Sequence, residues 1–393
     1  MELNYLGHMA MIEKEQSKVC HLTSVHPYND TRIFIKECWT LATAGYKTDL
    51  VAPNAPNEVI NSVHLHSVHK ANSSRILRMT KIAWAVYQKA QAINADIYHF
   101  HDPELIPIGL LLKMEGKRVI YDVHEDVPQD ILGKTWIAPV LRKPIACLIR
   151  SLENFAAKRF DAVVAATPYI CDRFLKLGCH AVNINNYPIL TELYLPDVDW
   201  SKKECAVCYV GGIFYIRGIF EIVEALGQTD TKLLLAGQFW PSALRERVVT
   251  MPGWNNVEEL GQLNRNEVAK TLARAMAGLV LFHPEPYHLD AQPNKMFEYM
   301  SAGLPVIASN FPLWKKIIEG NECGICVDPM NPEAIREAIQ WLIEHPDEAK
   351  RMGENGRRAV EEKYNWESQV VSLTKLYNLN RKTEQDYSKN EGK

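Results

Sequence analysis

Short apolar strands alternate with helices along this sequence, and the whole pattern occurs twice. Such alternation predicts a doubly wound parallel sheet, because parallel strands need a crossover connection that is usually a helix. We therefore predict an α/β fold of two Rossmann-like parallel-sheet domains facing a cleft. The predicted strands are residues 19–25, 48–52, 63–68, 96–100 and 117–121, and then 206–210, 232–236, 256–260, 278–282 and 305–308. The predicted helices include residues 31–44, 75–94, 105–114, 332–344, 346–363 and 367–377.

The same pattern sets the expected domain boundaries. A chain of 393 residues is long enough for two α/β domains of nearly equal size. We predict a first domain over residues 18–186, a linker over 187–203 and a second domain over 204–365. A flexible N-terminus (1–17), a C-terminal helix (366–380) and a disordered tail (381–393) complete the expected organisation.

Composition argues against several classes of protein. A net charge of −3 is too balanced for a nucleic-acid-binding protein, and there is no long apolar run to span a membrane. The N-terminus lacks the profile of a signal peptide, so we expect a cytoplasmic protein. No Gly-x-Gly-x-x-Gly follows the first strand of either half, which argues against an NAD-dependent dehydrogenase.

The nine cysteines form no disulfide framework, but two Cys-x-x-Cys pairs could in principle bind zinc. One pair is Cys205 and Cys208, and the other is Cys323 and Cys326. Both pairs lie in apolar runs that read as strands, where residues three apart point to opposite faces. We therefore favour reduced cysteines that pack in the core.

Residues 290–309 contain the most informative motif. Asp290 and Glu298, with seven residues between them, bracket the start of a helix predicted over about residues 293–302. The free N–H groups of its first turn would lie beside Asn294 and Lys295, which suits a diphosphate. Glu298 shares a helix face with Asn294, and its carboxylate could accept hydrogen bonds from the paired hydroxyls of a ribose.

Polar loops follow three strands of the first half, where a parallel sheet binds its ligands. These loops carry His26, Asp30 and Arg32 after the first strand, His101 and Asp102 after a later one, and His124 after the next. A histidine together with an aspartate in three such loops indicates a functional site rather than packing.

These motifs resemble the retaining glycosyltransferases of family four (glycosyl transferases group 1), which have the two-Rossmann GT-B architecture. The resemblance rests on the acid pair with its Gly-x-Pro-Val-Ile continuation and on His-Pro-x-x-Asp-x-Arg, His-Asp-Pro and Tyr-Asp-x-His-Glu, and it covers about residues 18–378. It implies that the first domain binds the acceptor and the second the nucleotide sugar. Three departures are present: Asp290 replaces a glutamate, Gly211-Gly212 replaces a Gly-Arg pair, and residues 27–29 replace a glycine loop.

The resemblance also implies roles for individual residues. His124 matches the family's active-site histidine near the reacting sugar, and Arg217 matches the basic residue on the donor pyrophosphate. The expected catalytic residues are His124, Arg217, Lys295 and Glu298. The expected donor-binding residues are Gly211, Gly212, Gly237, Gly261, Asp290, Asn294 and Glu298, and the expected acceptor-side residues are His26, Asp30, Arg32, His101 and Asp102.

The implied reaction is the retaining transfer of a sugar from a nucleoside-diphosphate sugar to a glycan or lipid-linked acceptor in surface polysaccharide assembly. We expect neither a metal nor a cofactor beyond this co-substrate, with a UDP-sugar favoured and a GDP-sugar as the alternative. An Asp-x-Asp sequence at 197–199 lies in the linker and is discounted as a metal motif. Two other functions stay open: a nucleotide-sugar epimerase of the same fold, and an inactive homologue that binds the nucleotide sugar.

Residues 134–159 interleave basic and apolar side chains around Trp136. Such a segment could lie on an anionic membrane surface, which would place the protein at the inner face of the plasma membrane. The alternative is an ordinary helix that packs on the first domain and has a solvated basic face.

Overall fold

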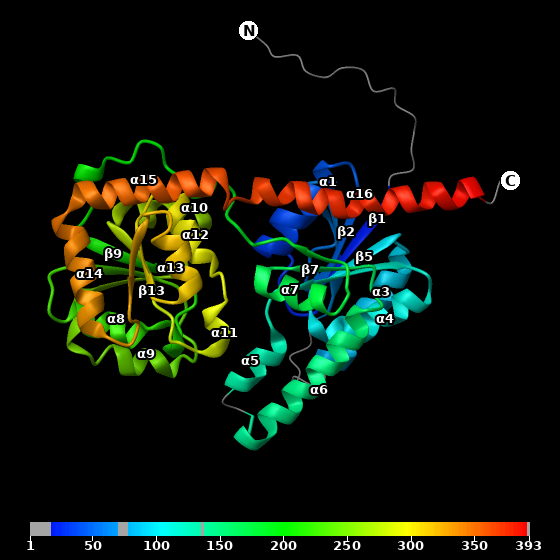
Figure 1. Ribbon diagram of the computed structural model, residues 1–393, viewed down its shortest axis with the longest axis horizontal. Coiled ribbons are helices and arrows are strands. Elements are labelled where there is room, and N and C mark those ends of the chain that lie inside the picture. Colours follow the sequence, from blue (N-terminus) through cyan, green and yellow to red (C-terminus); the bar gives the residue numbers. More distant parts are fainter. Residues whose placement is uncertain (1–16, 70–77, 135–136, 391–393) are drawn as a thin grey trace, which may run out of the picture. The chain divides into compact units, whose positions relative to one another are not determined.

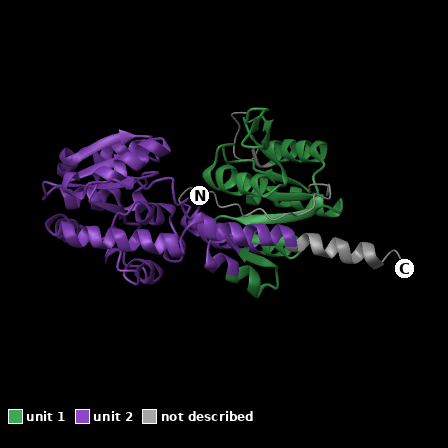
Figure 2. Cartoon of the chain, turned by 90° about the horizontal axis from the view of Figure 1, so that it is seen from above, with its two compact units in different colours: residues 1–124, 151–164, 172–182 green, residues 125–150, 165–171, 183–393 purple. Residues whose placement is uncertain are grey.

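The computed structural model describes residues 17–69, 78–134 and 137–390 (Figure 1). Contacts within the chain divide it into two compact units (Figure 2). Unit 1 comprises residues 1–124, 151–164 and 172–182, and unit 2 comprises residues 125–150, 165–171 and 183–393. All but the last residue of the expected flexible N-terminus (1–17) lies outside the described residues. The domain boundaries given by the sequence stay a prediction.

The first sheet has eight strands in the order β3-β4-β2-β1-β5-β6-β7-β8. β1 pairs in parallel with β2 and β5, and only the short β3 is seen to run antiparallel to its neighbour. The strands are β1 (Lys18–Leu22), β2 (Lys47–Pro53), β3 (Val59–Ile60), β4 (Val63–Val68), β5 (Ile97–Phe100), β6 (Arg118–Val123), β7 (Ala162–Ala165) and β8 (Ala181–Asn183). The helices are η1 (Thr31–Cys38), α1 (Trp39–Thr43), η2 (Arg78–Ile82), α3 (Ala83–Ile93), η3 (Pro103–Leu105), α4 (Ile106–Met114), α5 (Val127–Gly133), α6 (Pro139–Ala157) and α7 (Pro168–Lys176).

The second sheet has six strands in the order β11-β10-β9-β12-β13-β14, and its paired strands run parallel. The strands are β9 (Ala206–Val210), β10 (Lys232–Ala236), β11 (Val257–Gly261), β12 (Ala277–Val280), β13 (Val306–Ser309) and β14 (Gly324–Val327). The helices are η4 (Trp200–Lys202), η5 (Tyr215–Arg217), α8 (Ile219–Leu226), α9 (Ala243–Val248), η6 (Pro252–Asn256), α10 (Arg265–Arg274), α11 (Pro286–Leu289), α12 (Asn294–Ser301), α13 (Pro312–Ile318), α14 (Pro332–Glu344), α15 (Pro346–Glu362) and α16 (Trp366–Asn390).

Helices cover both faces of the second sheet, so successive residues of one strand enter two different cores (Figure 1). In β9, Ala206 and Cys208 pack in one core, while Val207 and Tyr209 pack in the other. A strand buried on both faces is apolar at every position, which explains why these strands read as continuous apolar runs.

Several elements have the bounds that the sequence predicts, namely β4, β9, β10 and α14. The sequence predicts a first strand that ends at residue 25, but β1 ends at Leu22, so the predicted strand is too long. Beyond it the chain bends from Ser24, and the Thr23 hydroxyl and the Ser24 amide donate hydrogen bonds to Asp102. Helix α16 also differs, since it continues to Asn390 through the region expected to be a disordered tail.

The cysteines are free thiols, and none of them belongs to a group of metal-ligating side chains among the residues that the structure describes. Cys208 and Cys323 are buried in the core as predicted. Cys205 is exposed, so the core interpretation is wrong for this residue.

Candidate active site

Three glycine-bearing strand ends meet at one edge of the second sheet. The Gly211 amide donates to the Ala236 carbonyl at 2.9 Å, and the Gly237 amide donates to the Gly261 carbonyl at 2.7 Å. Gly237 has a φ of +143°, and a Cβ atom there would lie 2.0 Å from the Gly211 carbonyl oxygen. The ends of β9, β10 and β11 can approach this closely only because no side chain separates them. The structure thus brings together the predicted donor residues Gly211, Gly237 and Gly261.

Lys295, in the first turn of α12, places a buried ammonium group beside this edge. Its Nζ lies 3.5 Å from the centroid of the Tyr209 ring and 3.5 Å from the position that a Cβ atom would take on Gly211. Within the described parts of the chain, Nζ has no hydrogen-bond partner. Burial, together with the neighbouring charge of Arg217, holds the pKa of Lys295 well below its usual value. A buried cation without a partner is costly, which makes this a natural position for a bound anion.

Arg217 ends the short helix η5, which follows β9. Its Nη1 donates to the Gly212 carbonyl at 3.2 Å, and its guanidinium lies over the rings of Phe214 and Phe282, at 4.7 and 5.2 Å from their centroids. Gly218 lets the chain turn into α8 with a φ of +73°, where a Cβ atom would collide with the Leu281 carbonyl. The sequence thus folds this loop so that a second cation is held near the end of β9.

The acid-pair motif forms the predicted helix with a shift of one residue. Pro293 is the N-cap of α12 rather than its first helical residue, and Gly303, with a φ of +73°, follows its end as predicted. Asn294 is exposed at the helix start, and Asp290 is exposed at the end of α11. Solvent therefore reaches two polar side chains that lie close in sequence to the first-turn amides of α12.

Glu298 forms an ion pair that the sequence does not predict. Its Oε1 lies 2.9 Å from Nη1 of Arg265, and Arg265 also donates two hydrogen bonds of 2.7 Å to Glu192. The carboxylate is partly exposed, so it remains accessible to a ligand. Nothing in the local pattern around Arg265 distinguishes it from a solvated basic residue at the start of α10.

The histidine and aspartate loops of the first half form one network in unit 1. Asp30 caps η1 by accepting hydrogen bonds from the Arg32 and Ile33 amides, and it lies 3.4 Å from His26. Burial lowers the pKa of His26, but the hydrogen bond to Asp30 and the charge of Asp102 outweigh it and raise the pKa overall. For Asp30 the balance is opposite: burial raises its pKa, while His26 and the Ile33 amide lower it overall.

Asp122 holds the centre of this network. It accepts hydrogen bonds of 2.9 and 2.8 Å from the buried Arg32, and its Oδ2 lies 2.7 Å from Nε2 of His124 and 3.0 Å from Nδ1 of His101. Burial raises the pKa of Asp122, but the charges of Arg32 and His124 lower it well below its usual value overall. Asp122 stands in the Tyr-Asp-x-His-Glu motif, so the sequence contained a signal for it.

The predicted acceptor-side residues and the predicted catalytic residue His124 differ in accessibility. Arg32, His101 and Asp102 are buried, whereas His26 and His124 are partly exposed, with 32% and 19% of their side chains accessible. Asp102 accepts hydrogen bonds from the Thr23 hydroxyl and the Ser24 amide. The buried members therefore organise the loops, and the two exposed histidines can reach a ligand.

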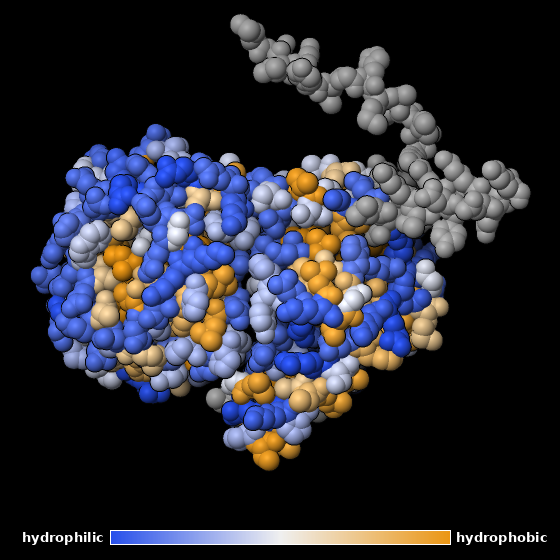
Figure 3. Space-filling view, viewed as in Figure 1, coloured by the Kyte–Doolittle hydropathy of each residue, from blue (hydrophilic) through white to orange (hydrophobic). Residues whose placement is uncertain are grey.

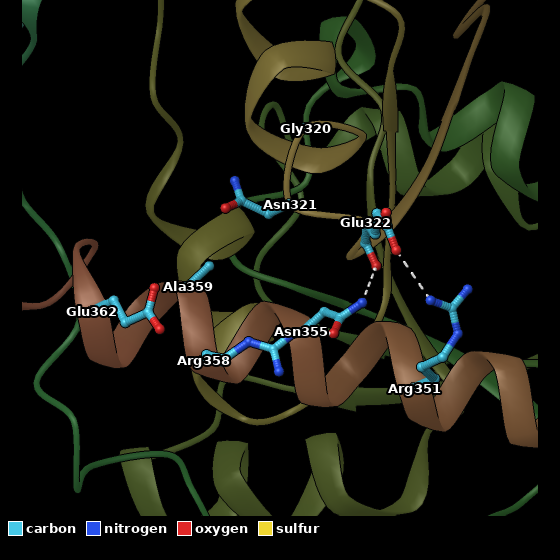
Figure 4. Close-up of a pocket in the computed structure, with 8 residues that line it drawn as sticks. All are labelled: Gly320, Asn321, Glu322, Arg351, Asn355, Arg358, Ala359 and Glu362. Atoms are coloured by element: carbon cyan, nitrogen blue, oxygen red, sulfur yellow. Dashed lines mark hydrogen bonds and ion pairs between the residues drawn. The ribbon is translucent and has the colours of Figure 1, made fainter.

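A surface pocket of about 460 Å³ in unit 2 includes none of the predicted site residues (Figure 4). Its lining residues are Gly320, Asn321, Glu322, Arg351, Asn355, Arg358, Ala359 and Glu362. Glu322 pairs with Arg351 at 3.1 Å, and its carbonyl accepts a hydrogen bond from Asn355 at 3.0 Å. Because its polar groups pair with one another, we assign no chemistry to this pocket.

Helix α6 carries exposed apolar side chains (Figure 3). They are Val140, Leu141, Leu148, Leu152 and Phe155. Trp136 of the predicted membrane segment lies outside the described residues. Across the residues with described positions, no helix is long and apolar enough to cross a bilayer.

Two family models match the chain side by side. The model described as "Glycosyltransferase Family 4" matches residues 35–185, and the model described as "Glycosyl transferases group 1" matches residues 192–359. The chain belongs to the group 1 glycosyltransferases. Both sheets lie largely within the two matches, as does every predicted site residue of this glycosyltransferase except His26, Asp30 and Arg32.

Curated relatives agree with the family assignment. The chain is 24% identical over 304 residues to the D-rhamnosyltransferase WbpZ of Pseudomonas aeruginosa, a match that covers 74% of this chain and 76% of that protein. It is 26% identical over 293 residues to the O-antigen chain mannosyltransferase C of Escherichia coli, covering 71% and 74% of the two chains.

Solved structures agree with the fold. Sucrose-phosphate synthase from Thermosynechococcus elongatus superposes with a TM-score of 0.77 at 19% identity, covering 94% of this glycosyltransferase and 100% of that chain. Anabaena HepE in complex with UDP and glucose superposes with a TM-score of 0.70 at 14% identity, covering 92% and 100%. The two parallel-sheet units are therefore those of a GT-B glycosyltransferase.

Proposed function

We propose that this glycosyltransferase transfers a sugar, with retention of its anomeric configuration, from a nucleoside-diphosphate sugar to a glycan or lipid-linked acceptor in surface polysaccharide assembly. The observation that carries the proposal is the buried ammonium of Lys295, which has no hydrogen-bond partner in the described residues and lies beside Gly211. A diphosphate would supply the missing counter-charge, and the first-turn amides of α12 would add hydrogen bonds to it.

The two cations suit the departure of a nucleoside diphosphate. When the bond between the anomeric carbon and the phosphate oxygen breaks, both bonding electrons stay on the phosphate and its negative charge grows. Lys295 and Arg217 would stabilise this growing charge more than the charge of the bound donor, and that difference lowers the barrier. Because side chains supply this charge, we propose that the diphosphate needs no divalent cation and the reaction no further cofactor.

Glu298 would fix the nucleoside by accepting hydrogen bonds from the ribose hydroxyls. Its ion pair with Arg265 holds the carboxylate in position without burying it. Asp290 and Asn294 are exposed near the start of the same helix, which leaves both able to contact the donor.

On the acceptor side we propose that His124 contacts the reacting sugar. Asp122 engages Nε2 of His124, which fixes the ring and leaves Nδ1 for the substrate. In the proposed reaction the acceptor oxygen attacks the anomeric carbon from the face that the phosphate leaves, and the acceptor proton passes to the departing phosphate oxygen. His26, beside Asp30 and Asp102, would bind the acceptor.

Relatives narrow the substrates that we propose. WbpZ is a D-rhamnosyltransferase and the Escherichia coli relative is an O-antigen chain mannosyltransferase, which supports a polysaccharide acceptor. Anabaena HepE has been solved with UDP and with UDP-glucose. We favour a UDP-sugar as the donor and keep a GDP-sugar as the alternative.

We also propose that α6 docks on the cytoplasmic face of the plasma membrane. Its exposed apolar side chains lie among basic residues such as Arg142, Lys143 and Arg150, a combination that binds anionic bilayers. Wild-type protein should co-sediment with anionic liposomes at low salt, and the double change Arg142→Glu and Lys143→Glu should weaken this, each residue contributing about 1 kcal/mol. Failure of the wild type to bind would favour a soluble acceptor.

The transfer reaction is tested in two steps. A thermal-shift screen of UDP- and GDP-sugars identifies the donor, and an assay with and without a glycan acceptor then follows its turnover. Transfer that depends on the acceptor, with the anomeric configuration retained in NMR spectra, supports the proposal. Donor isomerisation without an acceptor would indicate the epimerase, and nucleotide binding without any turnover would indicate an inactive homologue.

A further inference from the structure

Three histidines and a glutamate meet in the interior of unit 1. His21 comes from β1, His99 comes from β5, and Glu37 comes from η1, while His101 directly follows the end of β5. The strand register aligns His21 with His99 across the pair β1 and β5, and His101 follows two residues later. The side chains of His21, Glu37, His99 and His101 are completely buried.

One nitrogen or oxygen from each of these four side chains lies within 4.8 Å of the other three. His21 Nδ1 is 2.9 Å from His101 Nε2, and Glu37 Oε2 is 3.9 Å from His21 Nδ1 and 3.8 Å from His99 Nδ1. In a tetrahedral site with bonds of 2.0–2.1 Å, ligand atoms are separated by about 3.3 Å. The observed separations lie on both sides of that value, so small side-chain rotations would complete the tetrahedron.

His101 is oriented as a metal ligand usually is. Its Nδ1 lies 3.0 Å from Asp122 Oδ2, so Nδ1 carries the proton and Nε2 presents a lone pair towards His21 and Glu37. A carboxylate behind a histidine fixes the tautomer and increases the basicity of the ligating nitrogen.

The Glu37 carboxylate needs a cation that its protein neighbours supply only in part. Neither of its oxygens accepts a hydrogen bond from the described residues, although Arg32 Nε lies 3.1 Å from Oε1. Arg32 already donates two hydrogen bonds to Asp122, so most of its charge is balanced there. A buried carboxylate in this position is stabilised by a further cation.

We propose that His21, Glu37, His99 and His101 bind one divalent transition-metal ion of the zinc type. The ligand atoms are His21 Nδ1, His99 Nδ1, His101 Nε2 and Glu37 Oε2. Three imidazoles and one carboxylate in tetrahedral geometry suit zinc, and the complete burial makes the site structural rather than catalytic. The ion ties β1 and β5 to η1, and so fixes the loop between β1 and η1 that carries His26. This inference is independent of the donor chemistry of unit 2.

The first test is the metal content of the full chain. The protein is purified without a histidine tag and without a chelator. It is then dialysed briefly against EDTA to remove loosely bound ions, denatured, and analysed for transition metals by mass spectrometry. We expect about one ion per chain, because a buried structural site exchanges slowly. Ordered protein that contains no stoichiometric metal and refolds equally well with zinc or with a chelator would overturn the proposal.

The second test uses cobalt as a spectroscopic probe in three variants. Glu37→Gln and His21→Gln each remove a ligand, whereas His66→Gln is the matched control, because His66 pairs with Asp49 on the same sheet at 2.6 Å and lies outside the cluster. Wild type and His66→Gln refolded with Co²⁺ should show the visible bands of tetrahedral cobalt, and the ligand variants should lose them. If the ligand variants do not fold, the wild-type spectrum decides: absence of tetrahedral bands overturns the site.

Discussion

Replacing Lys295 by methionine should stabilise the protein in the absence of nucleotide while it impairs transfer. Methionine keeps the length and the apolar character of the lysine stem but removes the buried ammonium group. Stability and activity should therefore change in opposite directions, as expected where a functional charge is held in an unfavourable place.

The size of the stabilisation follows from two bounds. At pH 7 the burial of a lysine can reduce the free energy of unfolding by at most about 4.6 kcal/mol. This bound is the cost of removing the proton of an ordinary lysine at pH 7, at about 1.36 kcal/mol per pKa unit. The ammonium lies 3.5 Å from the Tyr209 ring centroid. A desolvated cation–π contact of this kind stabilises the folded state by up to about 2 kcal/mol, which offsets part of that cost. We expect a net gain of about 1–3 kcal/mol, or about 2–12 °C in Tm for a unit of this size.

The pH dependence gives a second readout of the same charge. The folded-state pKa of Lys295 is lowered, so between that pKa and the value in the unfolded chain the unfolded state binds more protons. Stability of the wild type should therefore rise with pH through this window, as the penalty of the buried charge is relieved. Lys295→Met should lack this part of the slope.

The assay is thermal unfolding of wild type, Lys295→Met and Lys316→Met, each without ligand and with the nucleotide found in the donor screen. Lys316 is exposed on α13 in the same unit, so its substitution controls for the loss of a charge alone. We expect Lys295→Met to have the highest Tm without ligand and the smallest shift on adding nucleotide. A Tm below that of wild type at neutral pH would refute the reasoning.

Four further outcomes are expected. Glu298→Gln should weaken nucleotide binding in calorimetry by about 1.5–3 kcal/mol, about 10- to 150-fold. The control Glu192→Gln, which removes the other carboxylate partner of Arg265, should change nucleotide affinity little. Equal losses of affinity in the two variants would contradict the proposed contact between Glu298 and the ribose. Arg217→Ala should lower kcat more than it raises the donor KM, and an increase in KM alone would indicate uniform binding instead. Adding EDTA, Mg²⁺ or Mn²⁺ to the folded enzyme should leave transfer unchanged, so strict dependence on either ion would contradict a diphosphate held by side chains. Finally, the pair of His26 and Asp30 should stabilise the fold most at pH values between about 3.9 and 6.5, the pKa values of the two groups in the unfolded chain. The folded pKa of Asp30 is lowered, so its contribution to stability is lost as pH falls. The folded pKa of His26 is raised, so its contribution to stability is lost as pH rises. Urea unfolding of His26→Ala across pH should show a flatter profile, and an unchanged profile would count against the pair.

The sequence by itself determined the fold class and many element ends. Strands β9 and β10 are continuous apolar runs that stop at Gly211 and Gly237, and α14 begins at a proline after Asn331, so local pattern and turn chemistry agree at these places. The donor motif was also readable, because Lys295, Glu298 and Gly303 lie within one helix and its cap, where spacing along the chain fixes spacing in space.

Only the tertiary structure decided which distant residues meet. Glu298 pairs with Arg265 from another helix, and His21 meets His99 because β1 and β5 are neighbours in the sheet although 78 residues separate them in the chain. Strand order and register depend on the packing of the whole sheet, and no local pattern encodes them. For the same reason the sequence predicts that Lys295 is near the donor, but only the fold shows that its ammonium is buried over Tyr209 without a partner among the described residues.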